Sequence, residues 1–218
     1  MVRYVSTRIQ EGTKMKLFLD LCSGLGGASE AFASDPTWVV IRIENNEKLA
    51  DVPHTRILDV KQWLDWIDDI SFEAFEAVVI WASPPCREFS DGYNSPKSIA
   101  ARDDKLDEYE PDMEIFDACR EIIEYVSPQY WVIENVKGAS PYFIEEIGPH
   151  RQRIGPFLLW GCFPFIDVGP YFKHEKGKHD VHSSNPLRSN IKAKIPIQVS
   201  VALMIAIDSV TRLDRWIN

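Results

Sequence analysis

The chain has 218 residues, of which 45% are hydrophobic, and its net charge is −9. This length and apolar content can bury the core of one domain, and the acidic balance argues against a protein that binds nucleic acid over its whole surface. The four cysteines form no Cys-x-x-Cys pair and no leader-like segment opens the chain, so we expect a cytoplasmic protein without a disulfide framework. The apolar run at 199–207 is too short to cross a bilayer, so we expect no membrane contact.

The positive charges are concentrated in one segment. Residues 150–194 carry eight Lys or Arg and three acids, which makes the segment +5 and leaves −14 elsewhere. This asymmetry is typical of a local phosphate-facing surface, although a solvated loop with incidental lysines has the same composition. Three histidines in the segment are irregularly spaced with no cysteine nearby, so we expect no metal site; they are His174, His179 and His182.

Short apolar strands alternate with helices along the chain from Lys16, after an N-terminal stretch without a clear period that ends at Met15. Strands are expected at 17–21, 38–43, 56–58, 77–80, 130–133 and 157–160, and helices at 28–34, 60–69, 113–125 and 199–214. This alternation predicts an α/β fold with a doubly wound, mostly parallel sheet. Residues 90–111, rich in Asp, Gly, Asn and Pro, are expected to form a long mobile loop that could act as a lid.

A glycine-rich turn follows the first strand, in the segment Asp20-Leu21-Cys22-Ser23-Gly24-Leu25-Gly26-Gly27. Glycines let the backbone pass close to a ligand, but such a turn alone is a tight connection about as often as a binding site. Glu44 ends the second strand and Asp59 follows the third, where acids can accept hydrogen bonds from ribose hydroxyls and an adenine amino group. Each acid alone is typical of a solvated surface or a helix cap. Asp20, Glu44 and Asp59 occur in this order, each at a strand end, and together they favour an adenosine-containing cofactor.

A cysteine and a glutamate follow two further strands. Pro84 and Pro85 precede Cys86 and stiffen its turn at the sheet edge where open α/β folds place their chemistry. A free cysteine is usually a small core hydrophobe, but the polar flanks favour a nucleophile, and Arg87 could favour the thiolate. Glu134 would be costly to bury ionised, so we expect a raised pKa and a carboxyl able to donate a proton to a ring nitrogen.

Several segments, in chain order, resemble the motifs of the DNA cytosine-5 methyltransferase family. They are the run 20–27, Pro85-Cys86 with Phe89-Ser90, Glu134-Asn135-Val136, and Arg151-Gln152-Arg153 leading into 157–161, with 195–199 similar to the closing segment. The resemblance covers about residues 16–210. It implies S-adenosylmethionine as cofactor, and the residues that would bind it are Asp20, Cys22, Gly24, Gly26, Glu44, Asp59 and Pro85.

The resemblance also implies a covalent mechanism on cytosine in DNA. The Cys86 thiolate would add to C6 and make C5 nucleophilic, while Glu134 at N3 stabilises the developing charge; methyl transfer, loss of the C5 proton and elimination of the cysteine complete turnover. The base must be flipped out of the duplex, and the loop 90–111 would close over it. Arg151 and Arg153 would brace the base or the loop, unless they only form a salt-bridged strand start. Candidate contacts with the nucleic acid are Arg87, Ser90, Asn135, Lys173, Lys176, Lys178 and Arg188.

The chain departs from the family pattern at several positions. Cys22 stands where an aromatic residue is usual, Arg87 replaces a glutamine, Pro149-His150 replaces another, and no asparagine precedes the closing segment near Lys194. The target-recognition region is also much reduced, so we expect low sequence selectivity or a separate specificity subunit. We therefore divide the chain into an extension (1–15), a catalytic and cofactor-binding domain (16–162), a short basic loop region (163–194) and a C-terminal segment that packs back on the catalytic domain (195–218).

Two other functions remain open at this point. Ser83-Pro84-Pro85 also resembles the turn of methyltransferases that act on exocyclic amino groups, and RNA is a further acceptor; Glu134 has no role in the amino-group chemistry. A non-catalytic nucleic-acid-binding subunit could keep the same fold. The presence of both Cys86 and Glu134 argues against that reading.

Overall fold

The structure is a computed structural model that describes residues 14–174 and 184–217. Its centre is a seven-stranded sheet in the order β3-β2-β1-β4-β5-β7-β6. The strands are β1 (Lys16–Leu21), β2 (Trp38–Glu44), β3 (Thr55–Ile57), β4 (Ala77–Ala82), β5 (Tyr130–Asn135), β6 (Gln152–Ile154) and β7 (Phe157–Cys162). The first five strands pair in parallel, and β7 runs antiparallel between β5 and β6. The predicted doubly wound, mostly parallel sheet is confirmed.

The helices differ more from expectation than the strands do. The structure has α1 (Glu30–Ala33), α2 (Pro96–Arg102), α3 (Glu114–Val126), α4 (Ser140–Ile147), α5 (Arg188–Ala193) and α6 (Ile197–Ile217). It also has six 3₁₀ turns: η1 (Glu47–Leu49), η2 (Val60–Asp65), η3 (Ile67–Asp69), η4 (Phe72–Ala74), η5 (Leu106–Glu108) and η6 (Lys137–Ala139). The helix predicted at 60–69 is wrong in type, since η2 and η3 occupy it. Neither α4, α5 nor β6 was predicted.

Alternating side chains of the strands build two hydrophobic layers. On β1, Leu17, Leu19 and Leu21 pack on the side of α3, whereas Phe18 packs with the core of α1 and α6. All four side chains are fully buried. Central parallel strands are covered on both faces in this way, which explains why they read as continuous apolar runs rather than as alternating ones.

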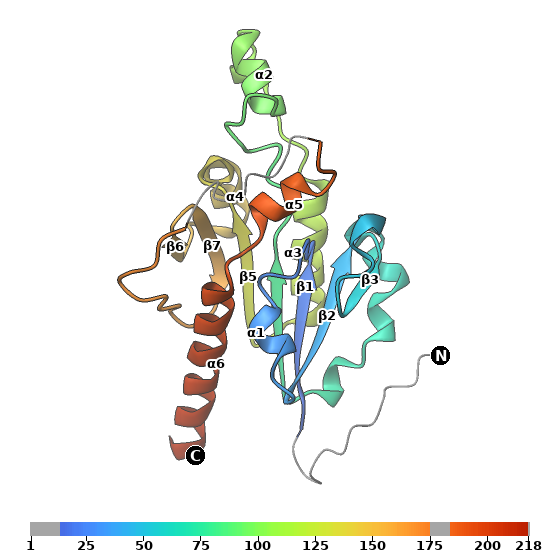
Figure 1. The fold of residues 1–218 in the computed structure, drawn as a ribbon, viewed down its shortest axis with the longest axis vertical. Helices are drawn as coiled ribbons and strands as arrows, with labels where there is room; N and C mark the ends of the chain where they lie inside the picture. Colours follow the sequence, from blue (N-terminus) through green and yellow to red (C-terminus); the bar gives the residue numbers. More distant parts are fainter. Residues whose placement is uncertain (1–13, 175–183, 218) are drawn as a thin grey trace.

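Residues 90–111 form a folded excursion, not the structureless loop that their composition predicted. Ser95 caps α2 by accepting a hydrogen bond from Ser98 N, and Pro96 occupies the first helical position. Figure 1 shows α2 standing away from the sheet, beyond the tip of β1, with α5 on the same side of the molecule. The excursion therefore extends from the edge where the parallel strands end.

The C-terminal segment lies directly against the turn between β1 and α1. The Ser200 hydroxyl donates to Ala28 O (2.6 Å) and accepts from Ala31 N (3.0 Å), so α6 is bonded to both ends of the first turn of α1. Lys194 forms an ion pair with Glu30 (2.8 Å), and a Cβ added at Gly27 would collide with the backbone of Ile195. Among the described residues, no helix combines the length and apolarity that crossing a membrane requires.

Replacing Ser200 by alanine tests the attachment of α6. Ser200 is buried, so Ser200→Ala leaves the Ala28 carbonyl and the Ala31 amide without their partner and should lower the free energy of unfolding by about 1–3 kcal/mol. The matched control is Ser209→Ala on the same helix, where the exposed hydroxyl bonds only Ile205 O, and a change within about 0.5 kcal/mol is expected. Urea denaturation measures both. Equal effects of the two changes would contradict the packing described here.

Candidate active site at the carboxyl ends of the strands

Four charged side chains lie on one face of the sheet, near the carboxyl ends of the parallel strands. In β1, Leu19 and Leu21 belong to the α3 side, so Asp20 between them points to the side of α1 and α6. The same alternation places Arg42 and Glu44 of β2, and Glu134 of β5, on that side, because Ile43 and Ile133 pack on the other. All four are buried, with 1–9% of their surface exposed. Buried charges of this density are expensive, and each is compensated differently.

The turn that carries Cys86 is fastened on several sides. Asn135 Nδ2, at the end of β5, donates to Pro84 O (2.9 Å), and Phe89 N donates to Cys86 O (3.1 Å). The Phe89 ring is 2% exposed and packs against Tyr142 and Phe143. The half-buried Cys86 therefore lies on a short turn that is held at both ends. Asn135 of β5 holds the turn before Cys86, and the packing of Phe89 against α4 holds it after Cys86.

Asn135 has a different position from the one predicted. Its amide is 1% exposed, its Nδ2 bonds Pro84 O, and its Oδ1 accepts from Val136 N (2.9 Å). With both polar ends of the side chain engaged inside the fold, Asn135 is placed to orient the cysteine turn. This argues against our prediction that it contacts nucleic acid.

Cys86 and Glu134 influence each other electrostatically. Burial raises the pKa of Glu134 from 4.5 to about 7, opposed only by a hydrogen bond from Ser83. Burial, and next the charge of Glu134, raise the pKa of the Cys86 thiol above its usual value. The raised carboxyl pKa agrees with the expectation from the sequence. Arg87 is exposed and is not among the groups that set the thiol pKa, so the prediction that it favours the thiolate is wrong for this structure.

The glycine turn is shaped by left-handed residues and an acid. Gly24 and Gly26 have φ values of +53° and +69°, and Gly26 N donates to Ser23 O (2.8 Å). Glu44 Oε2 accepts from Gly24 N (2.8 Å), and its Oε1 accepts from Asn46 N (3.0 Å). The predicted ribose acceptor therefore ties the end of β2 to this turn, and each of its oxygens keeps one further lone pair for a ligand.

A second buried carboxyl lies below the turn. Asp20 Oδ2 accepts from Ser29 Oγ (2.5 Å), and Ser29 Oγ accepts from Arg42 Nε (2.8 Å). Burial raises the pKa of Asp20 from 3.8 to about 7, although the Ser29 hydrogen bond and the Arg42 charge lower it. Asp20 is thus held by Ser29 and, through Ser29, by Arg42.

The other cofactor candidates lie around the same turn and along η2. Cys22 has a φ of +54° and is half-buried, and a hydrogen bond with Cys119 of α3, together with burial, raises its thiol pKa. Asp59 Oδ1 accepts from Lys61 N (2.9 Å) as the N-cap of η2 and lines a polar hollow between η2 and α3. Pro85 is exposed next to the cysteine. The sequence reading of Asp59 as a helix cap is therefore confirmed, and its adenine contact stays a prediction.

Arg151 and Arg153 lie on different faces of the sheet, and only Arg151 is on the side of Glu134. Arg153 lies opposite Leu158, on the α3 side of the sheet, whereas Glu134 lies opposite Leu159. Arg153 Nε donates to Gly155 O (2.9 Å) in its own hairpin, and the exposed Arg151 lies over the Phe163 ring at 5.6 Å. Within the described residues neither arginine forms an ion pair, so the salt-bridged strand start is not found there, and the role of the two arginines in bracing the base or the loop stays a prediction.

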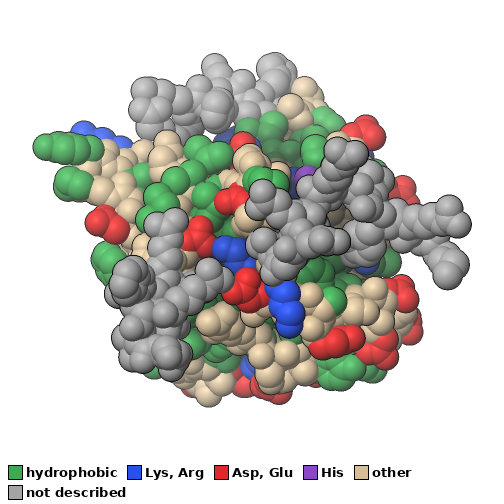
Figure 2. Space-filling view, turned by 90° about the horizontal axis from the view of Figure 1, so that it is seen from below, with side chains coloured by type: hydrophobic (Ala, Val, Ile, Leu, Met, Phe, Trp, Pro, Cys, Tyr) green, Lys and Arg blue, Asp and Glu red, His purple; other side chains and the backbone are tan. Residues whose placement is uncertain are grey.

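The predicted nucleic-acid contacts are spread over several segments of the chain. Lys173 and Arg188 are exposed, while Lys176, Lys178, His179 and His182 lie outside the described residues. Ser90 Oγ accepts from Gly92 N (3.0 Å) at the base of the excursion. Figure 2 shows the molecule from below, the side away from α2, where acidic and basic side chains lie interspersed with apolar ones.

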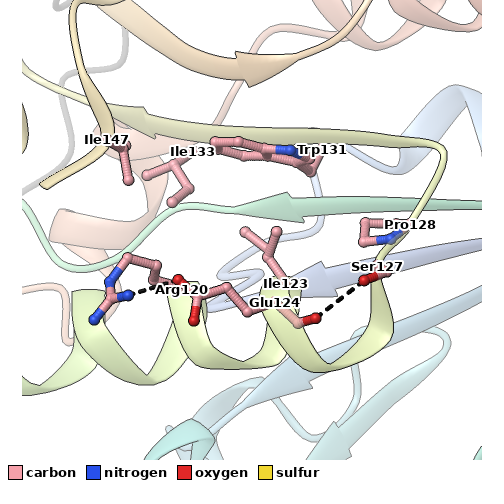
Figure 3. Close-up of a pocket in the computed structure, with 8 residues that line it drawn as sticks. All are labelled: Arg120, Ile123, Glu124, Ser127, Pro128, Trp131, Ile133 and Ile147. Atoms are coloured by element: carbon pink, nitrogen blue, oxygen red, sulfur yellow. Dashed lines mark hydrogen bonds and ion pairs between the residues drawn. The ribbon is translucent and has the colours of Figure 1, made fainter.

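A further hollow of about 370 Å³ lies between α3 and β5. Figure 3 shows it lined by apolar side chains such as Trp131 and Ile147, with the Arg120–Glu124 pair at one side. Ile133 also lines it, so it lies on the other face of the sheet from Glu134. This hollow does not belong to the site that contains Cys86.

Sequence reasoning missed Arg42, Ser29 and Tyr109. A signal for Arg42 was present, since it is a lone charge within the apolar run 38–43. Ser29 and Tyr109 carried no comparable signal, because their partners are distant in the sequence: Ser29 bonds Asp20 and Arg42, and Tyr109 Oη lies 2.7 Å from Glu88 Oε2.

The pKa of Glu134 predicts a pH-dependent stability. Because the folded chain holds this proton more tightly than the unfolded chain, the free energy of unfolding should fall as the pH rises from 4.5 to about 7 and then level off. Glu134→Gln removes this contribution, so the total decrease in the free energy of unfolding over this pH range should become smaller by at most about 3 kcal/mol. The decrease that remains comes from Asp20. Chemical denaturation between pH 4.5 and 8 measures it. Glu145→Gln, an exposed control, should keep the wild-type profile, and a Glu134→Gln profile parallel to wild type would contradict the burial of an ionisable carboxyl here.

Comparisons with known proteins agree with this geometry. The family model of the C-5 cytosine-specific DNA methylases matches residues 17–141. The Frog virus 3 (isolate Goorha) protein named "Probable DNA (cytosine-5)-methyltransferase" is 31% identical over 125 residues, which are 54% of this chain and 52% of the viral protein. The match thus spans about half of the relative. A solved structure of a protein encoded within an E. coli prophage, described as a DNA modification methyltransferase, covers 57% of this chain and 33% of its own, with 20% identity and a TM-score of 0.33. On the family match over more than half of its length, the chain belongs to the C-5 cytosine-specific DNA methylase family.

Proposed function

We propose that this chain transfers a methyl group from S-adenosylmethionine to C5 of cytosine in DNA, through a covalent bond between Cys86 and C6. The observation that carries the proposal is the placement of a thiol and a buried carboxyl at the ends of the neighbouring strands β4 and β5, close enough for the charge of Glu134 to raise the thiol pKa. The family match supports the same chemistry.

The residues around the glycine turn suit the proposed methyl donor. Ser23 Oγ is buried and has no hydrogen-bond partner within the described residues, which leaves a polar atom at the turn available to a ligand. Backbone amides of a strand-to-helix turn bind carboxylates, Glu44 could accept from ribose hydroxyls, and Asp59 could accept from the adenine amino group. When bound, S-adenosylmethionine would supply an electrophilic methyl group.

The protein's own groups perform the remaining chemistry. The Cys86 thiol must lose its proton, and its sulfur then bonds C6 of the cytosine while the electron pair of the C5–C6 double bond makes C5 nucleophilic. Glu134, with a pKa of about 7, can hold a proton at neutral pH and donate it to N3, which offsets the negative charge that develops on the ring. After C5 has been methylated, the C5 proton leaves to water, the Cys86 sulfur is expelled as a thiolate, and N3 returns its proton to Glu134, which restores the aromatic ring.

The excursion 90–111 is our candidate for closing over a flipped base. The C-terminal part of the excursion is attached to the cysteine turn, because Tyr109 Oη lies 2.7 Å from Glu88 Oε2 and 2.9 Å from Glu88 O. The DNA phosphates would face the basic segment that includes Lys173 and Arg188. A separate specificity subunit, and a cytoplasmic location, stay predictions from the sequence.

A mechanism-based trap tests the Cys86 assignment. DNA containing 5-fluorocytosine should form a stable covalent adduct with the protein in the presence of S-adenosylmethionine, because fluorine at C5 prevents the elimination step. Cys86→Ala should form no adduct and no methylated DNA, whereas Cys162→Ala, which changes an exposed cysteine at the end of β7, should behave as the wild type. Denaturing electrophoresis and mass spectrometry detect the adduct.

The same assay separates the rival functions. A normal methylation rate in Cys86→Ala would refute the nucleophile. Methyl label on an exocyclic nitrogen would support an amino-group methyltransferase, label transferred only to RNA would make RNA the acceptor, and donor-independent DNA binding without transfer would support a non-catalytic subunit.

Replacing Tyr109 by phenylalanine tests the role of the excursion. Tyr109→Phe removes only the hydroxyl that joins the C-terminal part of the excursion to Glu88, so adduct formation should slow about tenfold, the equivalent of one hydrogen bond to a charged group. The affinity for S-adenosylhomocysteine should stay unchanged. Tyr93→Phe, the same change at an exposed position of the excursion, is the control and should form the adduct at the wild-type rate. A wild-type rate in Tyr109→Phe would remove this hydroxyl from the proposal.

A further inference from the structure

Arg42 of β2 is a buried arginine without a role in the chemistry described above. Only 4% of its surface is exposed, and every nitrogen of its guanidinium donates a hydrogen bond: Nε to Ser29 Oγ (2.8 Å), Nη1 to Pro53 O (2.8 Å) and Nη2 to Gly26 O (3.1 Å). Arginine is rarely this buried unless its charge and donors are matched. Here the matching charge is Asp20, which reaches Arg42 through the Ser29 hydroxyl.

The three acceptors come from separate segments around the glycine turn. Gly26 O belongs to the turn itself, Ser29 precedes α1, and Pro53 O lies in the connection that leads to β3. The planar fork of an arginine can join them in one fixed geometry, whereas the single ammonium group of a lysine cannot. The guanidinium therefore sets how the turn, the start of α1 and the connection 52–54 lie relative to one another.

The fit between Arg42 and the turn is close. A Cβ added at Gly26 would collide with the Arg42 guanidinium, so the turn and the fork exclude any larger side chain at that position. Above the turn, Glu44 holds Gly24 N, and an added Cβ at Gly24 would lie 3.7 Å from Asn190 Nδ2 of α5. The turn is thus fixed at Gly26 by Arg42 and at Gly24 by Glu44. The Ser23 hydroxyl remains without a partner among the described residues.

We propose that Arg42 is a positioning residue that holds the glycine turn at residues 22–27 in the shape that receives the methyl donor. This inference rests on the proposed function, because it takes S-adenosylmethionine as the ligand of the turn. Glycines with positive φ leave a turn with many accessible conformations, and a binding site that must order itself on binding loses affinity. Fixing the Gly26 carbonyl before the ligand arrives removes this cost, so Arg42 acts on donor affinity without touching the reacting atoms.

The experiment compares Arg42→Lys and Ser29→Ala with wild type. The probe is S-adenosylhomocysteine, measured by isothermal titration calorimetry at a temperature where circular dichroism shows each variant folded. Loss of the fork in Arg42→Lys, or of its Ser29 acceptor in Ser29→Ala, should weaken binding about tenfold or more, with the affinity for a cytosine-containing duplex unchanged. In turnover assays KM for S-adenosylmethionine should rise while kcat at saturating donor stays near wild type.

The matched control is Arg120→Lys on α3, where the guanidinium pairs with Glu124 and Asp117 on the other face of the sheet. This variant should bind the probe as wild type does. Wild-type probe affinity in Arg42→Lys would overturn the inference, and so would a parallel loss of duplex binding and probe binding, since that would mean a purely structural role. If the wild-type chain itself binds no S-adenosylhomocysteine, the proposed function fails, and the inference fails with it.

Discussion

The burial of carboxyl groups at one edge of the sheet is the constraint on which the site depends. Asp20 and Glu134 follow apolar strand residues, and burial raises the pKa of each to about 7. An ionised carboxylate in such surroundings is costly unless it is paired or hydrogen-bonded. The neighbouring groups therefore decide what each acid can do: they either supply a charge that lets the proton leave, or they keep the proton available to a substrate.

The connection after β4 is buried at its start and exposed further along. The cysteine turn is held by Asn135 and by the buried Phe89, and a Cβ at Gly138 would collide with Phe89 O. Beyond this anchor the chain leaves the core as the excursion with α2, where Tyr93, Ile99 and Leu106 are exposed. A nucleophile has to be placed accurately, whereas a segment that admits a flipped base has to move. In the proposed function, the fixed turn would place the nucleophile and the exposed excursion beyond it would move.

The sequence predicted what depends on local patterns and missed what depends on distant partners. The six predicted strands are present, and five of them are dominated by apolar residues, whereas β3 is a three-residue strand at the sheet edge. The antiparallel strand β6 has only three residues and carries no apolar run. Cys86 and Glu134 could be chosen because Cys86 lies in the turn after β4 and Glu134 follows the apolar residues of β5. The face of Arg153 could not be predicted, because a hairpin that local patterns did not reveal turns it to the α3 side. The internal bond of Asn135 joins positions far apart in the chain and has no local signature.

The two buried acids differ in the partners that the fold gives them, and this difference separates their roles. Asp20 has the Ser29 hydroxyl and, through it, the Arg42 guanidinium, so a negative charge on Asp20 has a nearby counterion and the glycine turn keeps its shape when the proton leaves. Glu134 has only a hydrogen bond from Ser83, and no cation contributes to its pKa. Since the pKa of both acids is raised to about 7, their partners and not their pKa values distinguish them, and in the proposed mechanism Glu134 is the acid that donates to the ring nitrogen.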